Sequence, residues 1–341
     1  MSSALIVGPA WVGDMIMAQS LFKRLKSQKP DMQIDVLAPK ASLALTNRMT
    51  EVSESIQFDV GHGELGLSYR RSLARQISKR GYEEAIVLPN SLKSALVPFF
   101  ANIPKRTGFR GEYRYGLIND MRLLDKRRMP RMIDRFVALA KPGDGLPGAS
   151  EFPSLTVDSE RRGLLVEALR LETSRPLVGL CPGAEFGDAK RWPERHFAAL
   201  AESLVDAGAD VWIFGGNGDK GTAEEILKLV PRPVREHVLD LTGKTALLDV
   251  VDIMGLCKCV VSNDSGLMHV ASAIGCHTIV LYGSTSPEFT PPLTTKVDTV
   301  NLSLECSPCF KRSCPLGHKN CLNDLFPVQV DRLVSKVIGT E

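Results

Sequence analysis

The sequence VVSNDSGLMH, residues 260–269, joins a short apolar run to the first turn of a helical pattern. The apolar run suits a buried strand, and the apolar residues after it recur at helical spacing. Asp264, Ser265 and Gly266 would therefore lie at a helix N-terminus, where unpaired backbone N–H groups attract anions. Together with His269, they could bind the sugar hydroxyls and phosphate oxygens of a sugar nucleotide. In the alternative interpretation, Asp264 or Ser265 only caps the helix.

Strand and helix patterns alternate along the whole chain. The predicted strands are residues 4–7, 34–37, 85–88, 177–180, 211–214, 238–241, 257–261 and 278–281. The predicted helices follow the first strand and lie near residues 41–48, 65–80, 159–171, 194–207, 222–229, 247–256 and 267–274. Alternation of this kind is typical of parallel sheets covered by helices. The sequence therefore predicts an α/β protein with two doubly wound parallel-sheet domains.

Glycine and proline are dense at residues 141–148, which favours a domain boundary in that neighbourhood. A chain of 341 residues is long enough for two domains of ordinary size. We expect a first domain over residues 1–170 and a second over residues 171–325. A C-terminal helix over residues 326–341 could pack back on the first domain.

The turns that follow the strands are the expected ligand-binding positions. In open α/β sheets, ligands bind at the carboxyl ends of the strands, so these turns should line a shared cleft. Lys190 lies in the loop after the strand at residues 177–180 and is the natural phosphate ligand there. Its charge would offset that of a pyrophosphate leaving group as the bond breaks. Alternatively, Lys190 and Arg191 are a solvated surface pair.

Glycine and hydroxyl residues follow the next two strands of the second domain. Asp219 ends a glycine-rich turn and could accept hydrogen bonds from ribose hydroxyls, with Glu224 and Glu225 as weaker alternatives. Thr242 and Gly243 offer a hydroxyl and a small residue near the same cleft. These turns and residues 8–13 lack the spacing of the dinucleotide fingerprint and the full P-loop pattern, which disfavours an NAD enzyme.

The composition is that of a soluble globular protein, with 44% hydrophobic and 24% charged residues. A net charge of +3 is too small to indicate a dedicated nucleic-acid binder. The first residues lack the basic and apolar regions of a signal peptide. The longest uncharged stretch, residues 265–287, contains three glycines and divides into a helix and a strand, so it is a poor membrane span. We therefore expect a cytoplasmic protein.

The eight cysteines divide into two groups. Those in or beside strand-like apolar runs are expected in the core and comprise Cys181, Cys257, Cys259 and Cys276. Those that crowd together near the C-terminus comprise Cys306, Cys309, Cys314 and Cys321. Their spacing could supply tetrahedral zinc ligands, and reduced or occasionally oxidised structural cysteines would show the same spacing.

Motifs spread over nearly the whole chain are specific when they are taken together. They are Val12-Gly13-Asp14, the segment 89–95, Arg106-Thr107-Gly108 with Arg110-Gly111-Glu112, Lys190-Arg191-Trp192-Pro193, Asp264-Ser265-Gly266 with His269, and the cysteine-rich segment ending at Cys321. In these motifs the chain resembles the ADP-heptose:lipopolysaccharide heptosyltransferases. The resemblance implies a GT-B fold, in which two Rossmann-like domains face each other across a cleft. It also implies an inverting, metal-independent transfer of L-glycero-D-manno-heptose from ADP-heptose, with no cofactor required.

The resemblance also assigns roles to individual residues. Asp14 is implied to be the catalytic base, and the residue pattern independently places it after the first strand, facing the cleft. Inversion needs a carboxylate that removes the proton of the acceptor hydroxyl as that oxygen attacks the anomeric carbon. An N-cap is the alternative role for Asp14. By the same resemblance, the donor contacts are Lys190 to the phosphates, Asp264 to the heptose hydroxyls, and Ser265, Gly266 and His269 to the pyrophosphate and sugar.

The implied acceptor is an anionic glycolipid, the heptosylated Kdo–lipid A inner core, bound by the N-terminal domain. Residues 105–135 contain ten basic residues against four acidic ones. Such a segment attracts anionic ligands and membrane surfaces, although it is often only a solvated face. The candidate acceptor contacts are Ser91, Lys93, Arg106 and Arg110. We expect a monomer in peripheral contact with the cytoplasmic face of the inner membrane, with no nucleic-acid partner.

Two other hypotheses stay open at this point. A two-domain cleft does not fix the sugar or the base, so the chain could be another nucleotide-sugar transferase or a GT-B-type epimerase. It could also be a non-enzymatic metal-binding scaffold built around residues 306–321.

Overall fold

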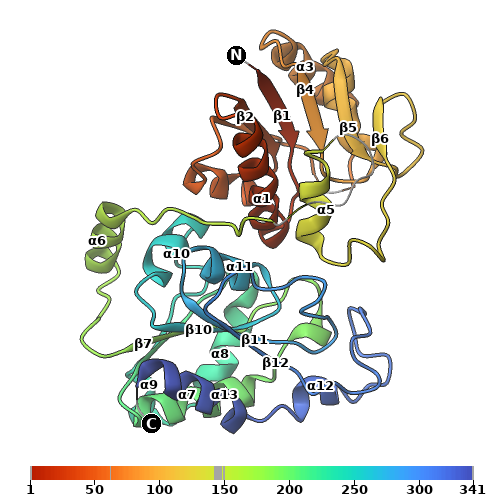
Figure 1. Ribbon diagram of the computed structural model, residues 1–341. Coiled ribbons are helices and arrows are strands. Elements are labelled where there is room, and N and C mark those ends of the chain that lie inside the picture. Colours follow the sequence, from red (N-terminus) through yellow and green to blue (C-terminus); the bar gives the residue numbers. More distant parts are fainter. Residues whose placement is uncertain (1, 62, 142–147, 149, 340–341) are drawn as a thin grey trace. The chain divides into compact units, whose positions relative to one another are not determined.

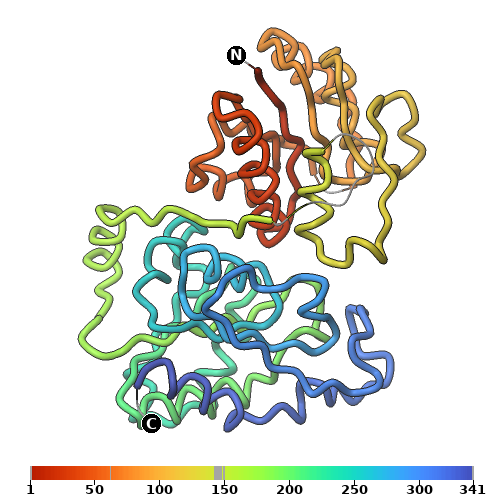
Figure 2. Tube along the Cα trace, in the orientation of Figure 1, coloured from red at the N-terminus to blue at the C-terminus, as the bar shows by residue number. Residues whose placement is uncertain are grey.

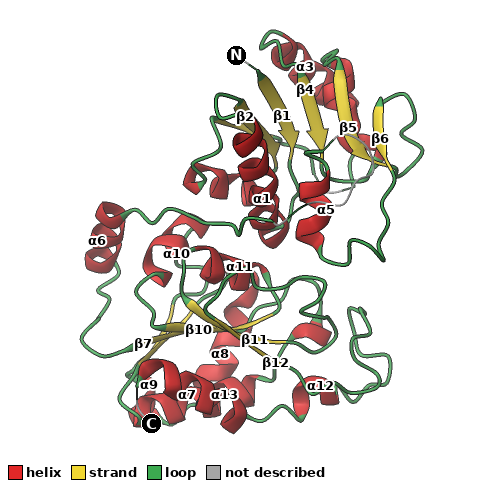
Figure 3. Ribbon diagram, in the orientation of Figure 1, coloured by secondary structure: helices red, strands yellow, loops and turns green. Residues whose placement is uncertain are grey.

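The computed structural model describes residues 2–61, 63–141, 148 and 150–339, and the chain divides into two units, Met1–Pro153 and Ser154–Glu341. Each unit contains a six-stranded, fully parallel sheet with helices packed against it (Figures 1 and 3). The predicted pair of α/β domains is therefore confirmed. Most of the breaker-rich segment, residues 142–147, lies outside the described residues.

The sheet of the first unit has the strand order β3-β2-β1-β4-β5-β6. Its strands are β1 (Ser3–Val7), β2 (Gln33–Ala38), β3 (Glu54–Gln57), β4 (Glu84–Val87), β5 (Lys105–Phe109) and β6 (Asp120–Arg122). The order reverses between β1 and β4, which pair directly with each other. The loops after these two strands therefore diverge at a topological switch point, where open α/β sheets bind ligands.

The helices of the first unit pack in two pairs. The helical elements are α1 (Val12–Gln28), α2 (Lys40–Leu43), α3 (Leu67–Ser78), α4 (Leu96–Phe100) and α5 (Met132–Ala138), with 3-10 turns at Ala44–Arg48 and Leu92–Ala95. Leu5 and Val7 of β1 share a core with Leu73 of α3 and Val97 of α4. Because side chains alternate along a strand, Ile6 faces the other side, where α1 packs against α5 (Figure 1).

The second unit repeats this design, with the strand order β12-β11-β10-β7-β8-β9. Its strands are β7 (Leu177–Cys181), β8 (Asp210–Ile213), β9 (Val238–Asp240), β10 (Cys259–Asn263), β11 (His277–Leu281) and β12 (Val297–Val300). The order reverses between β7 and β10, which are also paired. A second switch point therefore lies where these two strands end.

The helices of the second unit include the C-terminal one. They are α6 (Ser159–Ala168), α7 (Glu194–Asp206), α8 (Lys220–Leu229), α9 (Arg232–Arg235), α10 (Leu247–Met254), α11 (Gly266–Ala273), α12 (Asn320–Asn323) and α13 (Pro327–Ile338), with 3-10 turns at Asp188–Lys190 and Asn217–Asp219. Val330 and Val334 of α13 are fully buried in the core of this unit, and α13 packs against α7. The expected C-terminal helix is therefore present and belongs to the second unit.

Helix α6 belongs to the second unit rather than the first. It packs against α10, and Arg161 of α6 forms an ion pair with Asp249 of α10. The division of the chain therefore falls between Pro153 and Ser154, before the expected residue 170. Residues 301–319 form neither strand nor helix and run as one long loop to α12 (Figure 2). Within the described part of the chain, no helix is long and apolar enough to cross a membrane.

Candidate active site

The loops after β7 and β10 are tied together by Asn263, the last residue of β10. Its side-chain oxygen accepts a hydrogen bond from the Trp192 N–H at 3.0 Å, and its side-chain nitrogen donates to the Pro182 carbonyl at 2.7 Å. Asn263 is completely buried, so both bonds are shielded from water. The loop that carries Lys190 is therefore held against the turn that carries Asp264.

Lys190 and Asp264 form a close ion pair at this switch point. The Lys190 ammonium lies 2.6 Å from Asp264 Oδ2, and the two side chains are only 13% and 4% exposed. Thr285 and Thr290 donate to the two oxygens of the same carboxylate, at 2.5 and 3.3 Å. The pair places a cation and a hydrogen-bond acceptor at one point, which suits a ligand that carries both phosphates and hydroxyls. A solvated surface role for Lys190 is wrong.

A second cation, Arg312, lies close to the same aromatic ring as Lys190. Lys190 Nζ lies 5.0 Å from the centroid of the Phe186 ring, and the Arg312 guanidinium lies 5.6 Å from it. Gly187 permits this approach, because a Cβ atom there would lie 2.3 Å from the Arg312 carbonyl oxygen. Arg312 comes from the long loop before α12, and the sequence patterns did not single it out. Its place beside Lys190 makes it a further candidate for phosphate contact.

His269 lies one turn into α11 and is buried, and its Nδ1 atom has no hydrogen-bond partner among the residues that the structure describes. Burial lowers the pKa of His269 to about 4, so the imidazole is neutral at neutral pH. Ser265 precedes α11 without making a side-chain capping bond, and the Asp264 carboxylate is bonded elsewhere. Ser265 is thus the N-cap residue by position, but among the described residues neither its side chain nor the Asp264 carboxylate makes a capping bond to α11. The neutral imidazole has an unused nitrogen that a ligand hydroxyl can engage.

Asp219 is fixed against the turn that follows β7. Its carboxylate accepts the Gly216 N–H at 2.9 Å, and a Cβ atom on Gly183 would lie 2.4 Å from its Oδ1 atom. Only a glycine at position 183 leaves room for Asp219 there. The carboxylate thus lies at the carboxyl end of the sheet, next along from Lys190.

Thr242 and Gly243 continue this row of polar turns at the end of β9. Thr242 is buried and donates to Asp240 at 2.7 Å, and Gly243 has a φ of +63°. A Cβ atom on Gly243 would lie 2.4 Å from the side-chain oxygen of Asn217 in the neighbouring turn. The turns after β10, β7, β8 and β9 therefore form a continuous polar edge that carries all the predicted donor residues.

In the first unit, the residues that follow β1 and β4 also lie at a switch point. Asp14 is half-buried in the first turn of α1, whose N-cap residue is Trp11, so the N-cap interpretation of Asp14 is wrong. Ser91 precedes the 3-10 turn after β4, and Lys93 lies within that turn. Because β1 and β4 are neighbours, Asp14, Ser91 and Lys93 follow adjacent strand ends.

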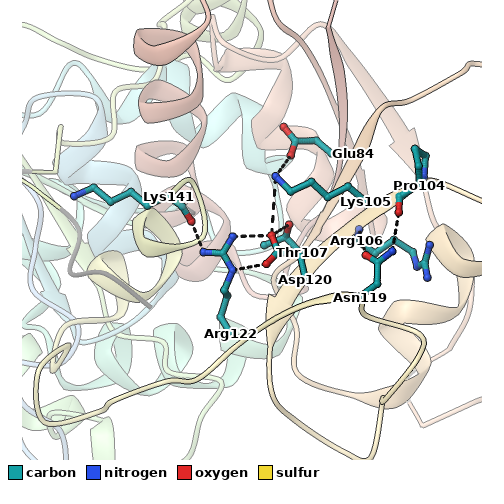
Figure 4. A network of polar contacts seen from close by, with 9 residues as sticks. All are labelled: Glu84, Pro104, Lys105, Arg106, Thr107, Asn119, Asp120, Arg122 and Lys141. Carbon is teal, nitrogen blue, oxygen red and sulfur yellow. Dashed lines mark hydrogen bonds and ion pairs between the residues drawn. The ribbon is translucent and has the colours of Figure 1, made fainter. Parts of the chain in front are cut away.

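The basic segment is largely occupied with internal contacts. The three guanidinium nitrogens of Arg106 donate to the carbonyls of Ile103, Leu117 and Gly116. Arg122 pairs with Asp120 and donates to the Lys141 carbonyl, while Lys105 bridges toward Glu84 (Figure 4). Arg106 thus supports the loop between β5 and β6, whereas Arg110 is exposed to solvent. The remaining exposed cations of this segment are Lys126, Arg127, Arg128 and Arg131.

The two groups of cysteines differ as predicted. Cys181, Cys257, Cys259 and Cys276 are buried in the second unit, and burial raises the pKa of each thiol. The other four, with His318, line one small cavity beside Ala189 and Ser284. Among the described residues, no three His, Cys, Asp or Glu side chains are arranged to hold a metal ion, so the zinc interpretation gains no support.

Comparison with known proteins decides the family. The model of glycosyltransferase family 9 (heptosyltransferase) matches residues 70–320, well over half of the chain. The chain belongs to this family. Lipopolysaccharide heptosyltransferase 2 of Salmonella typhimurium is 44% identical to it over 343 residues, with 99% of each chain covered. Lipooligosaccharide heptosyltransferase 2 of Haemophilus influenzae is 46% identical over 306 residues, with 87% of this chain and 88% of the relative covered.

The fold agrees with this assignment. The structure of Escherichia coli ADP-heptose LPS heptosyltransferase II superimposes with a TM-score of 0.88 at 41% identity, covering 99% of this chain and 98% of that one. The chain therefore has the predicted GT-B fold, built of two Rossmann-like domains, and the predicted glycosyltransferase class is confirmed. Family membership also disfavours the epimerase and the non-enzymatic scaffold.

Proposed function

We propose that this heptosyltransferase moves L-glycero-D-manno-heptose from ADP-heptose to the heptosylated Kdo–lipid A inner core, with inversion at the anomeric carbon. The supporting observation is the buried Lys190–Asp264 pair, with His269 beside it, at the switch point of a chain that matches heptosyltransferase 2 relatives over nearly its full length. The names of those relatives supply the sugar and the class of acceptor.

The donor pyrophosphate binds at Lys190 and at the start of α11, where Ser265 and Gly266 present backbone N–H groups. Asp264 and His269 accept hydrogen bonds from heptose hydroxyls, and Asp219 binds the ribose. Thr242 and Gly243 line the nucleotide end of the same polar edge. The Lys190 cation stabilises the charge that develops on the ADP leaving group, so the proposal requires neither a metal ion nor another cofactor.

Asp14 acts as the general base on the acceptor. Its carboxylate removes the proton from the acceptor hydroxyl as the hydroxyl oxygen forms a bond to the anomeric carbon. On the opposite face of the sugar, the bond to the ADP oxygen breaks and its electron pair leaves with ADP. Ser91, Lys93 and Arg110 bind the acceptor, and Arg106 shapes the adjoining loop through its carbonyl contacts.

If the acceptor is a glycolipid, the enzyme must contact a membrane surface to reach it. Exposed Arg110, Lys126, Arg127 and Arg128 supply positive charge for anionic lipids, and Tyr113 is 89% exposed in the same segment. We propose that the enzyme works as a monomer in peripheral contact with the cytoplasmic face of the inner membrane.

A substrate panel tests this function. The purified chain is incubated with the heptosylated acceptor and, in separate reactions, with ADP-heptose, UDP-sugars or GDP-sugars, and acceptor mass is measured. Of the donors tested, only ADP-heptose should add one heptose to the acceptor. Consumption of a different sugar nucleotide, with ADP-heptose left intact, would contradict the proposed donor.

A further inference from the structure

Arg114 is a completely buried cation in the loop between β5 and β6. Its guanidinium donates to the Pro89 carbonyl at 2.6 Å, the Phe109 carbonyl at 2.5 Å and the side-chain oxygen of Asn90 at 3.1 Å. A weaker bond reaches Ser94 Oγ at 3.3 Å. All these partners are neutral oxygens, and Arg114 takes part in none of the ion pairs found among the described residues.

A buried charge that forms no ion pair within the described part of the chain is costly, although the nearby Glu112 carboxylate offsets part of this cost, so its retention calls for a physical reason. Burial lowers the pKa of Arg114 to about 10, and the guanidinium still carries its charge at neutral pH. Its planar set of N–H donors joins two oxygens of the loop after β4 to the carbonyl of Phe109 at the end of β5, which a single lysine nitrogen could not do with the same geometry. The positive charge is hydrogen-bonded directly to residues 89–94, the loop that bears Ser91 and Lys93.

A second buried arginine holds the other end of this loop. Arg70 of α3 is 4% exposed, and it donates to the Lys93 carbonyl at 2.9 Å and to the Leu65 carbonyl at 2.7 Å. Its guanidinium also lies 4.6 Å from the centroid of the Phe58 ring. The main chain at Lys93 is thereby fixed from the side of α3.

The outer side of the loop is held by residues just before Arg114. The Glu112 carboxylate accepts the Leu92 N–H at 3.0 Å. At Gly111, a Cβ atom would lie 2.3 Å from the Asn90 carbonyl oxygen, so the two loops are in direct backbone contact. Residues 89–94 are therefore bonded from three sides by side chains that themselves lie outside the loop.

We propose that Arg114 and Arg70 are positioning residues for the acceptor. They fix residues 89–94 so that Ser91 and Lys93 meet an anionic sugar acceptor, and their charges favour its carboxylate or phosphate groups, although neither arginine touches it. This inference rests on the proposed function, because it presumes that the loop after β4 binds the acceptor. It predicts that replacing either arginine changes the KM for the acceptor without a matching change in the KM for the donor.

Steady-state kinetics of Arg114→Gln, Arg114→Lys and Arg70→Gln test the inference. We expect Arg114→Gln to raise the KM for the acceptor about tenfold or more, with the KM for ADP-heptose within about twofold of the wild type. Arg114→Lys keeps the charge but loses the donor geometry, so its acceptor KM should fall between those of Arg114→Gln and the wild type. Arg75→Gln, at an exposed position of α3, is the matched control for Arg70→Gln and should leave both KM values unchanged.

The outcomes are distinguishable. A folded Arg114→Gln variant with an unchanged acceptor KM would overturn the inference, as would a parallel rise in both KM values. If Arg114→Gln does not fold, Glu112→Ala takes its place in the test. Glu112 is exposed, and its replacement releases the Leu92 N–H. This variant must raise the KM for the acceptor and leave the KM for ADP-heptose unchanged. Wild-type enzyme that transfers no heptose would instead overturn the proposed function.

Discussion

The ammonium of Lys190 lies 2.6 Å from the carboxylate of Asp264, although the two residues are 74 positions apart in the chain. Both belong to turns at the ends of paired strands, β7 and β10, and the contact is nearly closed to solvent. Without donor, each charge compensates the other. A bound pyrophosphate would draw Lys190 toward its own oxygens, and Asp264 would then be available to sugar hydroxyls.

Replacing Lys190 by methionine should reduce catalysis because no cation would remain to stabilise the departing ADP. We expect kcat to fall by about 10²- to 10³-fold, as is typical when a preorganised electrostatic group is removed. Lys258→Met, an exposed lysine just before the other end of β10, is the matched control. Equal kcat values for the two variants would exclude Lys190 from the chemical step.

A methyl group at position 183 should weaken donor binding without touching the reacting atoms. In Gly183→Ala, the new Cβ atom would meet Asp219 at 2.4 Å, and the carboxylate must move away from the nucleotide edge. Calorimetric titration with ADP should show affinity reduced by about tenfold, on the order of 1.4 kcal/mol. Gly221→Ala in α8, where a Cβ atom meets open space, should bind ADP like the wild type. Unchanged binding by Gly183→Ala would argue against a role for Asp219.

Buried His269 should make the folded protein sensitive to acid. Its pKa is lowered from 6.5 to about 4 by burial, so between these values the unfolded chain binds a proton that the folded chain excludes. The free energy of unfolding therefore decreases as pH falls from about 6.5 to 4, by at most about 1.4 kcal/mol per pH unit from this group. Burial also lowers the pKa of His196, which adds to the same slope. Urea unfolding between pH 4 and 6.5 should show that the free energy of unfolding of His269→Gln depends less steeply on pH than that of the wild type. An equally steep dependence would contradict the attribution of this acid sensitivity to His269.

The packing of the C-terminal segment can be tested at Leu322. This side chain is fully buried in the core of the second unit, against Gly283. Leu322→Ala should destabilise that unit by about 2 to 5 kcal/mol, the usual cost of such a cavity. Tryptophan fluorescence is a suitable probe, because Trp192 and Trp212 are buried in the second unit. Substitution of exposed Leu316 by alanine should leave the unfolding midpoint unchanged.

The central strands were predictable because they are buried on both faces and form continuous apolar runs. Strands β3, β5, β6 and β12 were not predicted, because they carry charged and polar residues that hide the pattern, as in Glu54–Gln57 and Val297–Val300. The predicted helix at residues 41–48 is a short α2 followed by a 3-10 turn. The residue pattern alone could not reveal these polar strands or the change from α-helix to 3-10 turn.

The site was predictable where it follows from strand order. Lys190, Asp219 and Asp264 follow strand ends, and parallel topology brings such turns to one edge. Arg312 was missed because it lies in a loop without periodicity, and Arg114 was hidden within a basic run that suggested a solvated surface. The roles of Arg312 and Arg114 depend on contacts with residues distant in the chain, and residue spacing does not reveal such contacts.

Asp14 is the proposed base of an inverting heptosyl transfer, and Asp14→Asn tests this role most directly. The variant keeps the shape of the side chain but cannot accept the proton. We predict that kcat falls by about 10²- to 10⁴-fold while the affinity for ADP-heptose stays within about twofold. Asp31→Asn, at an exposed position of the same unit, serves as the control. Turnover by Asp14→Asn at the wild-type rate would contradict the account.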